Sequence, residues 1–156
     1  MANQQNATTS DAELILKLYD LRRESEMRKA RNFIAQFAPK NFDELSKVFF
    51  AWGTQENAWI RQVLSYWEMA ASLALRGAVN SDLFFDNSGE MFFVYTKFKP
   101  FLKDLREKFE MPEFLTRVET YINGTQEGRD RLKMFEERMA KFAAMQAQAG
   151  KAHAAD

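Results

Sequence analysis

The residue with the clearest capacity for chemistry is Glu68, a carboxylate flanked on both sides by aromatic and aliphatic residues. Such a position is at least partly shielded from water, and an unpaired buried charge is costly. Glu68 should therefore hold a cation or a proton. Arg61 and Arg76 share its helical stripe but lie about two turns away, too far for direct contact. We expect a partner from the neighbouring basic cluster, which includes Arg31.

The sequence allows two interpretations of this carboxylate. In the favoured interpretation Glu68 belongs to a structural ion pair. In the alternative it serves a small-molecule sensor or an enzyme, with Arg61 or Arg76 holding an anionic ligand. Carboxylate catalysis needs a second group facing the same cleft, and the sequence offers no acid with an evident relation to Glu68.

Other catalytic chemistry has little support in the composition. The chain has no Cys, which removes thiol nucleophiles, thiolate metal sites, iron–sulfur clusters and disulfides. The one His, His153, lies in an Ala-rich segment. The sequence has no Gly-rich phosphate loop and no nucleophile elbow. We therefore expect no metal site, no cofactor and no catalytic residue.

Aromatic residues are the second notable feature, with 15 Phe, 3 Trp and 4 Tyr. Most recur at helical spacing, which is typical of core packing. Several exceed what one stripe per helix can bury, and surplus apolar surface marks a partner interface or a ligand groove. The candidate interface residues are Phe49, Phe50, Trp52, Trp59, Phe92 and Phe93.

The elements that position these residues are all predicted to be helices. No stretch alternates with a period of two for long enough to form a strand, whereas three-and-four spacing recurs throughout. The segment 55–76 is apolar over so wide an arc that it should be the central helix of the bundle. The predicted fold is an all-α single domain of about six helices, with the first cap at Ser10 and Glu13.

The predicted domain covers residues 10–145. Residues 1–9 should form a flexible arm, and the Ala-rich segment 146–156 should be disordered. The segment 81–109 has two interpretations. Its apolar spacing predicts one long helix bent near Pro100, whereas the Asn87-Ser88-Gly89 turn predicts two helices.

Charge and hydropathy limit the partners. Acidic and basic residues balance at 22 each, so nucleic-acid binding is not expected. Between Lys17 and Arg31 there are six basic and three acidic groups. Such a mixture of charges is typical of a solvated helix face. The chain has neither a secretory signal nor a stretch that could span a membrane, which predicts a cytoplasmic protein.

Three segments resemble a known family: LYDLRRESEMRKAR at 18–31, VLSYWEMAASLALRGAVNSDLFF at 63–85 and FKPFLKDLREKF at 98–109. They are similar to a bacterial family of helical domains of unknown function, over roughly residues 12–109. The shared features are an aromatic-Glu pair in an apolar helix, a glycine at its end and a Lys-Pro-Phe segment. The resemblance implies a helical fold and no established reaction.

Together these features favour a non-enzymatic module that binds a protein partner or itself through its aromatic surplus. The alternative is a small-molecule sensor or an enzyme that uses Glu68 with a nearby arginine.

Overall fold

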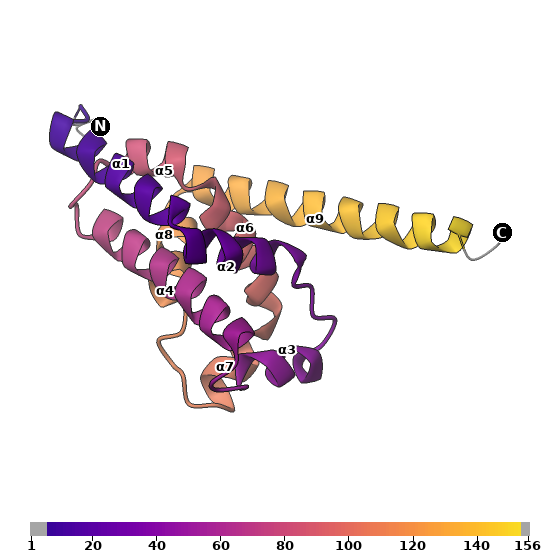
Figure 1. The fold of residues 1–156 in the computed structure, drawn as a ribbon. Helices are drawn as coiled ribbons and strands as arrows, with labels where there is room; N and C mark the ends of the chain where they lie inside the picture. The colour runs from indigo at the N-terminus through magenta and orange to yellow at the C-terminus, as the bar shows by residue number, and fades with distance from the viewer. Residues whose placement is uncertain (1–5, 154–156) are drawn as a thin grey trace.

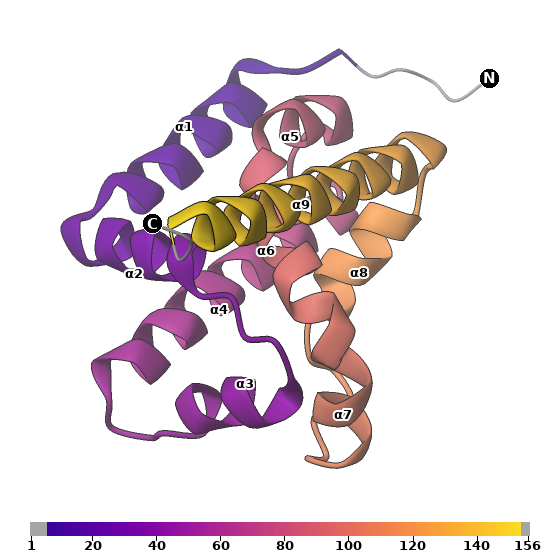
Figure 2. The same cartoon turned by 90° about the vertical axis from the view of Figure 1, so that its right-hand side faces the viewer.

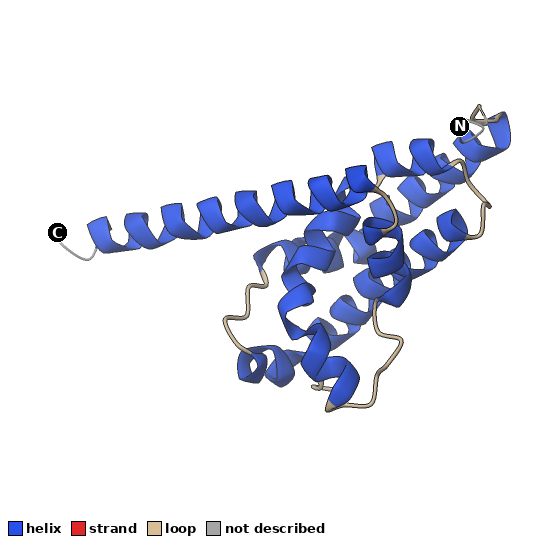
Figure 3. Ribbon diagram, turned by 180° about the vertical axis from the view of Figure 1, so that it is seen from behind, coloured by secondary structure: helices blue, strands red, loops and turns tan. Residues whose placement is uncertain are grey.

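The computed structural model describes residues 6–153, and every regular element in that range is helical (Figures 1 and 3). The prediction of an all-α single domain is confirmed, with more and shorter helices than the six expected. The elements are α1 Thr9–Arg23, α2 Ser25–Gln36, α3 Phe42–Phe49, α4 Gln55–Leu75, α5 Ser81–Asn87, α6 Gly89–Phe98, the 3₁₀ turn η1 Lys99–Phe101, α7 Leu102–Glu107, α8 Thr116–Asn123 and α9 Gln126–His153.

The first helix is capped two residues earlier than predicted, by Thr8 in place of Ser10. The Thr8 hydroxyl accepts a hydrogen bond from the Asp11 amide, and the Asp11 carboxylate accepts one from the Thr8 amide at 2.7 Å. This pair forms the capping box that was predicted for Ser10 and Glu13.

The apolar stripe changes phase after Arg22, which predicts a break near Glu24 and Ser25 with Ser25 as the cap. The chain breaks at Glu24, whose side chain caps α2 in place of Ser25.

Helix α4 contacts α2, α3, α5 and α8, in agreement with its predicted central place. Trp67 is buried and Trp59 is half-buried. One edge of α4 remains open, however, because Arg61, Ser65 and Met69 face solvent. The apolar arc is therefore narrower than predicted, and the open edge borders the groove described below. The buried residues of α4 are Asn57, Ile60, Val63, Leu64, Tyr66, Trp67, Ala70, Ala71 and Ala74.

The segment 81–109 is broken twice. Ser88 leaves the helical conformation and its hydroxyl donates to the Phe85 carbonyl, which separates α5 from α6. Pro100 lacks a backbone amide, and the chain tightens there into η1 before α7 continues. Neither a single bent helix nor two helices describes this segment. Most of α6 is buried, so this helix shares the centre of the bundle with α4.

Helix α9 is the longest element, and only its first half lies on the body. It packs on α6 and α8, with Leu132 buried and Phe135 stacked on Phe92. The rest projects from the bundle (Figures 1 and 3), and in Figure 2 its end points towards the viewer. The helix continues through 146–153, where composition predicted disorder, because Ala, Gln and Lys favour helix. Residues 1–5 of the predicted arm and 154–156 lie outside the described range.

No helix between residues 6 and 153 has both the length and the apolar character that crossing a membrane requires.

Candidate functional site

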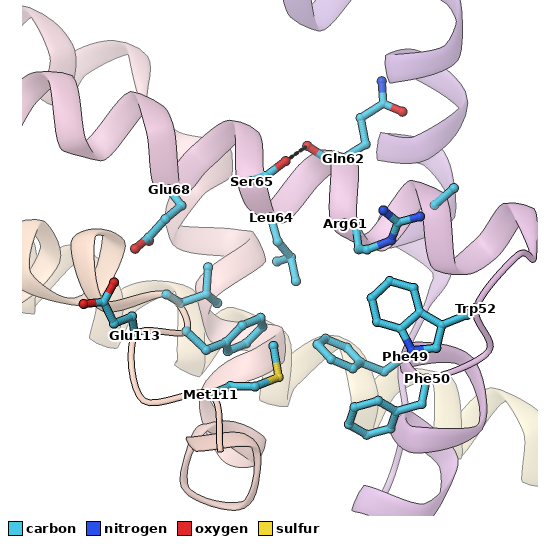
Figure 4. A pocket seen from close by; sticks show the side chains of 13 residues that line it. Phe49, Phe50, Trp52, Arg61, Gln62, Leu64, Ser65, Glu68, Met111 and Glu113 are labelled. Atoms are coloured by element: carbon cyan, nitrogen blue, oxygen red, sulfur yellow. Dashed lines mark hydrogen bonds between the residues drawn. The ribbon is translucent and has the colours of Figure 1, made fainter. Parts of the chain in front are cut away.

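A groove of about 600 Å³ runs along the open edge of α4 (Figure 4). One wall is the end of α3 with the turn that follows it, and the other is the segment that links α7 to α8. We call this cavity the α4 groove. Its lining brings together Glu68, Arg61 and half of the predicted interface residues. The lining residues are Phe49, Phe50, Trp52, Ala58, Arg61, Gln62, Leu64, Ser65, Glu68, Met111, Glu113, Phe114 and Leu115.

The buried side-chain amide of Asn57 holds the first wall in place. Asn57 is completely buried, and its Nδ2 donates to the carbonyl of Phe49 at 2.5 Å. Gly53 then turns the chain in the left-handed region at φ +87°, which a residue without a Cβ adopts at no steric cost. Trp52 is left 71% exposed at the rim of the α4 groove.

The second wall lies between two strained residues. Glu110 and Leu115 both have positive φ, at 52° and 54°. Such conformations cost about 1–3 kcal/mol each in non-glycine residues, and they cluster at binding sites. Arg106 supports the wall, because its Nε and Nη2 donate to the Phe114 carbonyl at 3.0 and 2.8 Å. The surrounding contacts thus hold this segment in a shape that its sequence alone would not favour.

Glu68 binds backbone amides, not a cation. Its Oε1 accepts from the Arg117 amide at 2.9 Å, and its Oε2 accepts from the Val118 amide at 3.1 Å. Both amides belong to the first turn of α8, whose N-cap residue Leu115 has no side-chain acceptor. A carboxylate is suited to this position because it satisfies free amides at the positive end of the helix dipole. Glu68 therefore caps α8 from another helix, and the expected cation partner is absent within residues 6–153.

Arg61 lies at the opposite end of the α4 groove from Glu68 (Figure 4). Its Nε donates to the Asn57 Oδ1 at 3.0 Å, and its guanidinium lies over the Trp52 ring at 5.1 Å. Arg76 lies beyond the last turn of α4 and does not line the groove. The structure thus separates the two arginines that the sequence associated with Glu68.

Arg31 pairs with a different carboxylate, Glu90 of α6. Its Nε contacts the two Glu90 oxygens at 2.8 and 2.9 Å, and Arg22 Nη2 contacts Glu90 at 2.5 Å. The three side chains are only 15–30% exposed. Nearby, Tyr66 donates to the Leu18 carbonyl, and burial raises the pKa of Tyr66 to about 12. We call Arg22, Glu90 and Arg31 the ion cluster, which joins α1 and α2 to α6.

The amino-acid sequence of residues 7–125 matches the family described as Domain of unknown function (DUF4760). The chain belongs to this family. The resemblance to a family of helical domains of unknown function is thereby confirmed. The DUF4760 domain includes the whole α4 groove, whereas α9 begins at Gln126, just after the matched residues. No curated protein and no solved structure matches the chain significantly.

The remaining aromatic candidates of the DUF4760 domain lie away from the α4 groove. Phe92 is completely buried in the core. Trp59 is half-buried against Phe33, and Phe93 is half-buried beneath the Lys97 ammonium group. Burial lowers the pKa of Lys97. These three residues therefore serve packing, and only Phe49, Phe50 and Trp52 contribute to the groove.

Sequence reasoning missed the second wall and the ion-cluster acid. The spacing of Phe114, Val118 and Ile122 predicts a short helix that opens at 111–112, whereas the structure begins this helix at Thr116 and leaves 111–115 as the wall. Nothing in that pattern associated the segment with α4.

Glu90 did carry a signal, because the apolar run 91–95 follows it directly, as apolar residues also follow Glu68. The same burial argument applied to Glu90 would have identified a second paired carboxylate.

The α4 groove of the DUF4760 domain combines many apolar side chains with a few polar groups. Each Glu68 oxygen accepts one backbone hydrogen bond, and the Ser65 hydroxyl donates to the Gln62 carbonyl. The Glu113 side chain is 79% exposed. No nucleophile among the lining residues is bonded to a base, and the described part of the chain has no group of three His, Asp or Glu that could hold a metal ion. The lining therefore offers mostly apolar contacts, with Arg61, Glu68 and Glu113 as its charged groups.

Proposed function

We propose that this DUF4760 domain is a non-enzymatic binding module and that the α4 groove binds a small, mostly apolar molecule. The observation that carries the proposal is the cavity of about 600 Å³ with its aromatic wall of Phe49, Phe50 and Trp52. Sites for small molecules typically measure about 300–1,000 Å³ and combine apolar walls with a few polar groups. The α4 groove fits both descriptions.

The enzyme alternative has less support. Glu68 is the carboxylate on which it depends, and both of its oxygens accept backbone hydrogen bonds. A general acid or base needs to lie within hydrogen-bond reach of the substrate proton that it transfers. The hydrogen bonds of Glu68 hold its carboxylate against the first turn of α8 instead.

Filling the α4 groove should abolish binding without unfolding the protein. Ser65 is exposed and lines the groove, so Ser65→Phe adds a ring to the cavity and removes no core contact. The wild-type protein should enhance the fluorescence of N-phenyl-1-naphthylamine, a neutral apolar probe, and the variant should lose most of this enhancement. Fluorescence titration measures both affinities.

The matched control is Gln55→Phe, which adds the same ring to an exposed position of α4 outside the groove. Circular dichroism should give the same helical signal for all three proteins. Equal probe binding by Ser65→Phe and the wild-type protein would show that the α4 groove is not the site.

A second candidate function is self-association through α9. The stripe formed by Leu132, Phe135 and Met139 continues to Phe142, which is 63% exposed, and the neighbouring Met145 is 64% exposed. A two-fold contact places the same stripe of two copies face to face, and three-and-four spacing suits helix pairing. Small alanine side chains dominate beyond Phe142 and allow a close approach. A second copy is therefore the partner that best fits this helix.

Charges on the exposed stripe should prevent this association. In Phe142→Glu/Met145→Glu both altered side chains lie in solvent, so the fold of one chain should be unaffected. Light scattering coupled to size exclusion should report a dimer for the wild-type protein and a monomer for the variant. A wild-type monomer at every concentration would contradict self-association. The matched control is Lys133→Glu, which changes the net charge by the same two units as the double variant but lies on the exposed face of α9 opposite the stripe.

A further inference from the structure

We propose that the ligand of the α4 groove carries a single carboxylate that binds Arg61, with an apolar body along the apolar lining. This inference rests on the proposed function, because it specifies the chemistry of a molecule in the same cavity. It follows from how Arg61 is held, from the charges of the lining and from their arrangement along α4.

Arg61 is held in place with its donors available. Its Nε donates to Asn57, whose side chain is completely buried and also holds the Phe49 carbonyl. Stacking over Trp52 at 5.1 Å restrains the guanidinium plane. Among residues 6–153, no carboxylate forms an ion pair with Arg61, and its terminal nitrogens have no protein acceptor. An oriented guanidinium whose two terminal nitrogens are both unused matches the two oxygens of a carboxylate.

The lining charges indicate one negative charge on the ligand. Arg61 is the one cationic side chain among the residues that line the α4 groove. A phosphate monoester carries nearly two negative charges at neutral pH, and sites for it generally combine several donors. One guanidinium neutralises one carboxylate, so the carboxylate is the better match.

The acidic residues fix the direction in which the ligand lies. Glu68 and Glu113 lie at the end of the α4 groove opposite Arg61 (Figure 4). Glu68 follows Arg61 by seven residues, which is about 10 Å along the helix at 1.5 Å per residue. An anion at the acidic end would be repelled. Leu64 and Met111 lie between the two ends (Figure 4) and offer apolar contact to the ligand body, and Phe114 also lines the groove.

Binding of decanoate and of its neutral analogue decanol tests the inference, with both below their aggregation concentrations. Trp52 borders the cavity, so Trp fluorescence and calorimetry can follow the titration. The wild-type protein should bind decanoate about tenfold more tightly than decanol, as one charge-assisted contact of about 1.4 kcal/mol implies. In Arg61→Met this preference should disappear because decanoate binding falls while decanol binding stays the same.

Arg76→Met is the matched control, since it removes an exposed arginine of the same helix region outside the groove and should leave both affinities unchanged. Equal binding of decanoate and decanol, unaffected by Arg61→Met, would overturn the carboxylate subsite and leave the apolar site intact. Tighter binding of decyl phosphate than of decanoate would overturn the choice of carboxylate. If no apolar probe binds at all, the proposed function fails together with this inference.

Discussion

Replacing Glu90 by glutamine is expected to lower the free energy of unfolding by about 2–3 kcal/mol. The substitution keeps the size of the side chain but removes its charge. Arg22 and Arg31 then lose their shared carboxylate. Breaking a fully buried pair costs about 3–5 kcal/mol, and the partial exposure of this cluster reduces that figure.

The loss should be visible in thermal unfolding. At about 2–4 °C per kcal/mol for a domain of this size, the midpoint should fall by about 4–12 °C. The effect exceeds that of an ordinary surface pair because the two guanidinium groups cannot move into water without disturbing the packing of α1 and α2. Arg22 also lies over the buried Trp67 ring, so its displacement affects the core.

Glu26→Gln is the matched control. Glu26 pairs with Lys29 on the surface of α2, where the side chains are 48% and 61% exposed. Such a pair contributes about 0–1 kcal/mol. Identical melting of Glu90→Gln and Glu26→Gln would contradict a structural role of the ion cluster. Replacing all three members by apolar residues of similar size should restore much of the stability, as it does for buried ion triads.

The second largest effect is expected for Glu68→Ala, at about 1–3 kcal/mol. The variant leaves the Arg117 and Val118 amides of α8 without their acceptor. Leu115 cannot replace it, because its side chain has no hydrogen-bonding group. Glu68→Gln should lose less, since an amide oxygen still accepts one of the two hydrogen bonds.

Hydrogen exchange can locate this effect. The Arg117 and Val118 amides should exchange faster in Glu68→Ala, while amides of α1 keep their protection. Glu13→Ala, which removes an exposed carboxylate from α1, is the control for the loss of a charge. Unchanged protection at the start of α8 would contradict the capping role, even if the protein were less stable. The measurement also separates a cap from an ion pair, which would not protect these two amides.

The candidate site was predictable only in part. Glu68 could be identified as a carboxylate that needs a partner, because its apolar neighbours are local in the sequence. Its actual partners, two amides about 50 residues further along, could not be identified. The position of Arg61 on the open edge of α4 was equally hidden, since an amphipathic pattern does not state which neighbours cover each face. Trp52 and Phe50 were recognised as surplus aromatics, but not as one wall of a cavity.

By itself the sequence determined that the chain is helical, that 55–76 would be a deeply packed helix and that Glu68 would not stay unpaired. These properties follow from hydrophobic spacing, from helix caps and from the cost of burying charge, all of which act over a few residues. Only the tertiary structure decided that Glu68 caps α8, that Glu90 pairs with Arg22 and Arg31, and that 111–115 forms a wall of the α4 groove. Those outcomes depend on which helix ends and loops come together in space, and local periodicity contains no information about that choice.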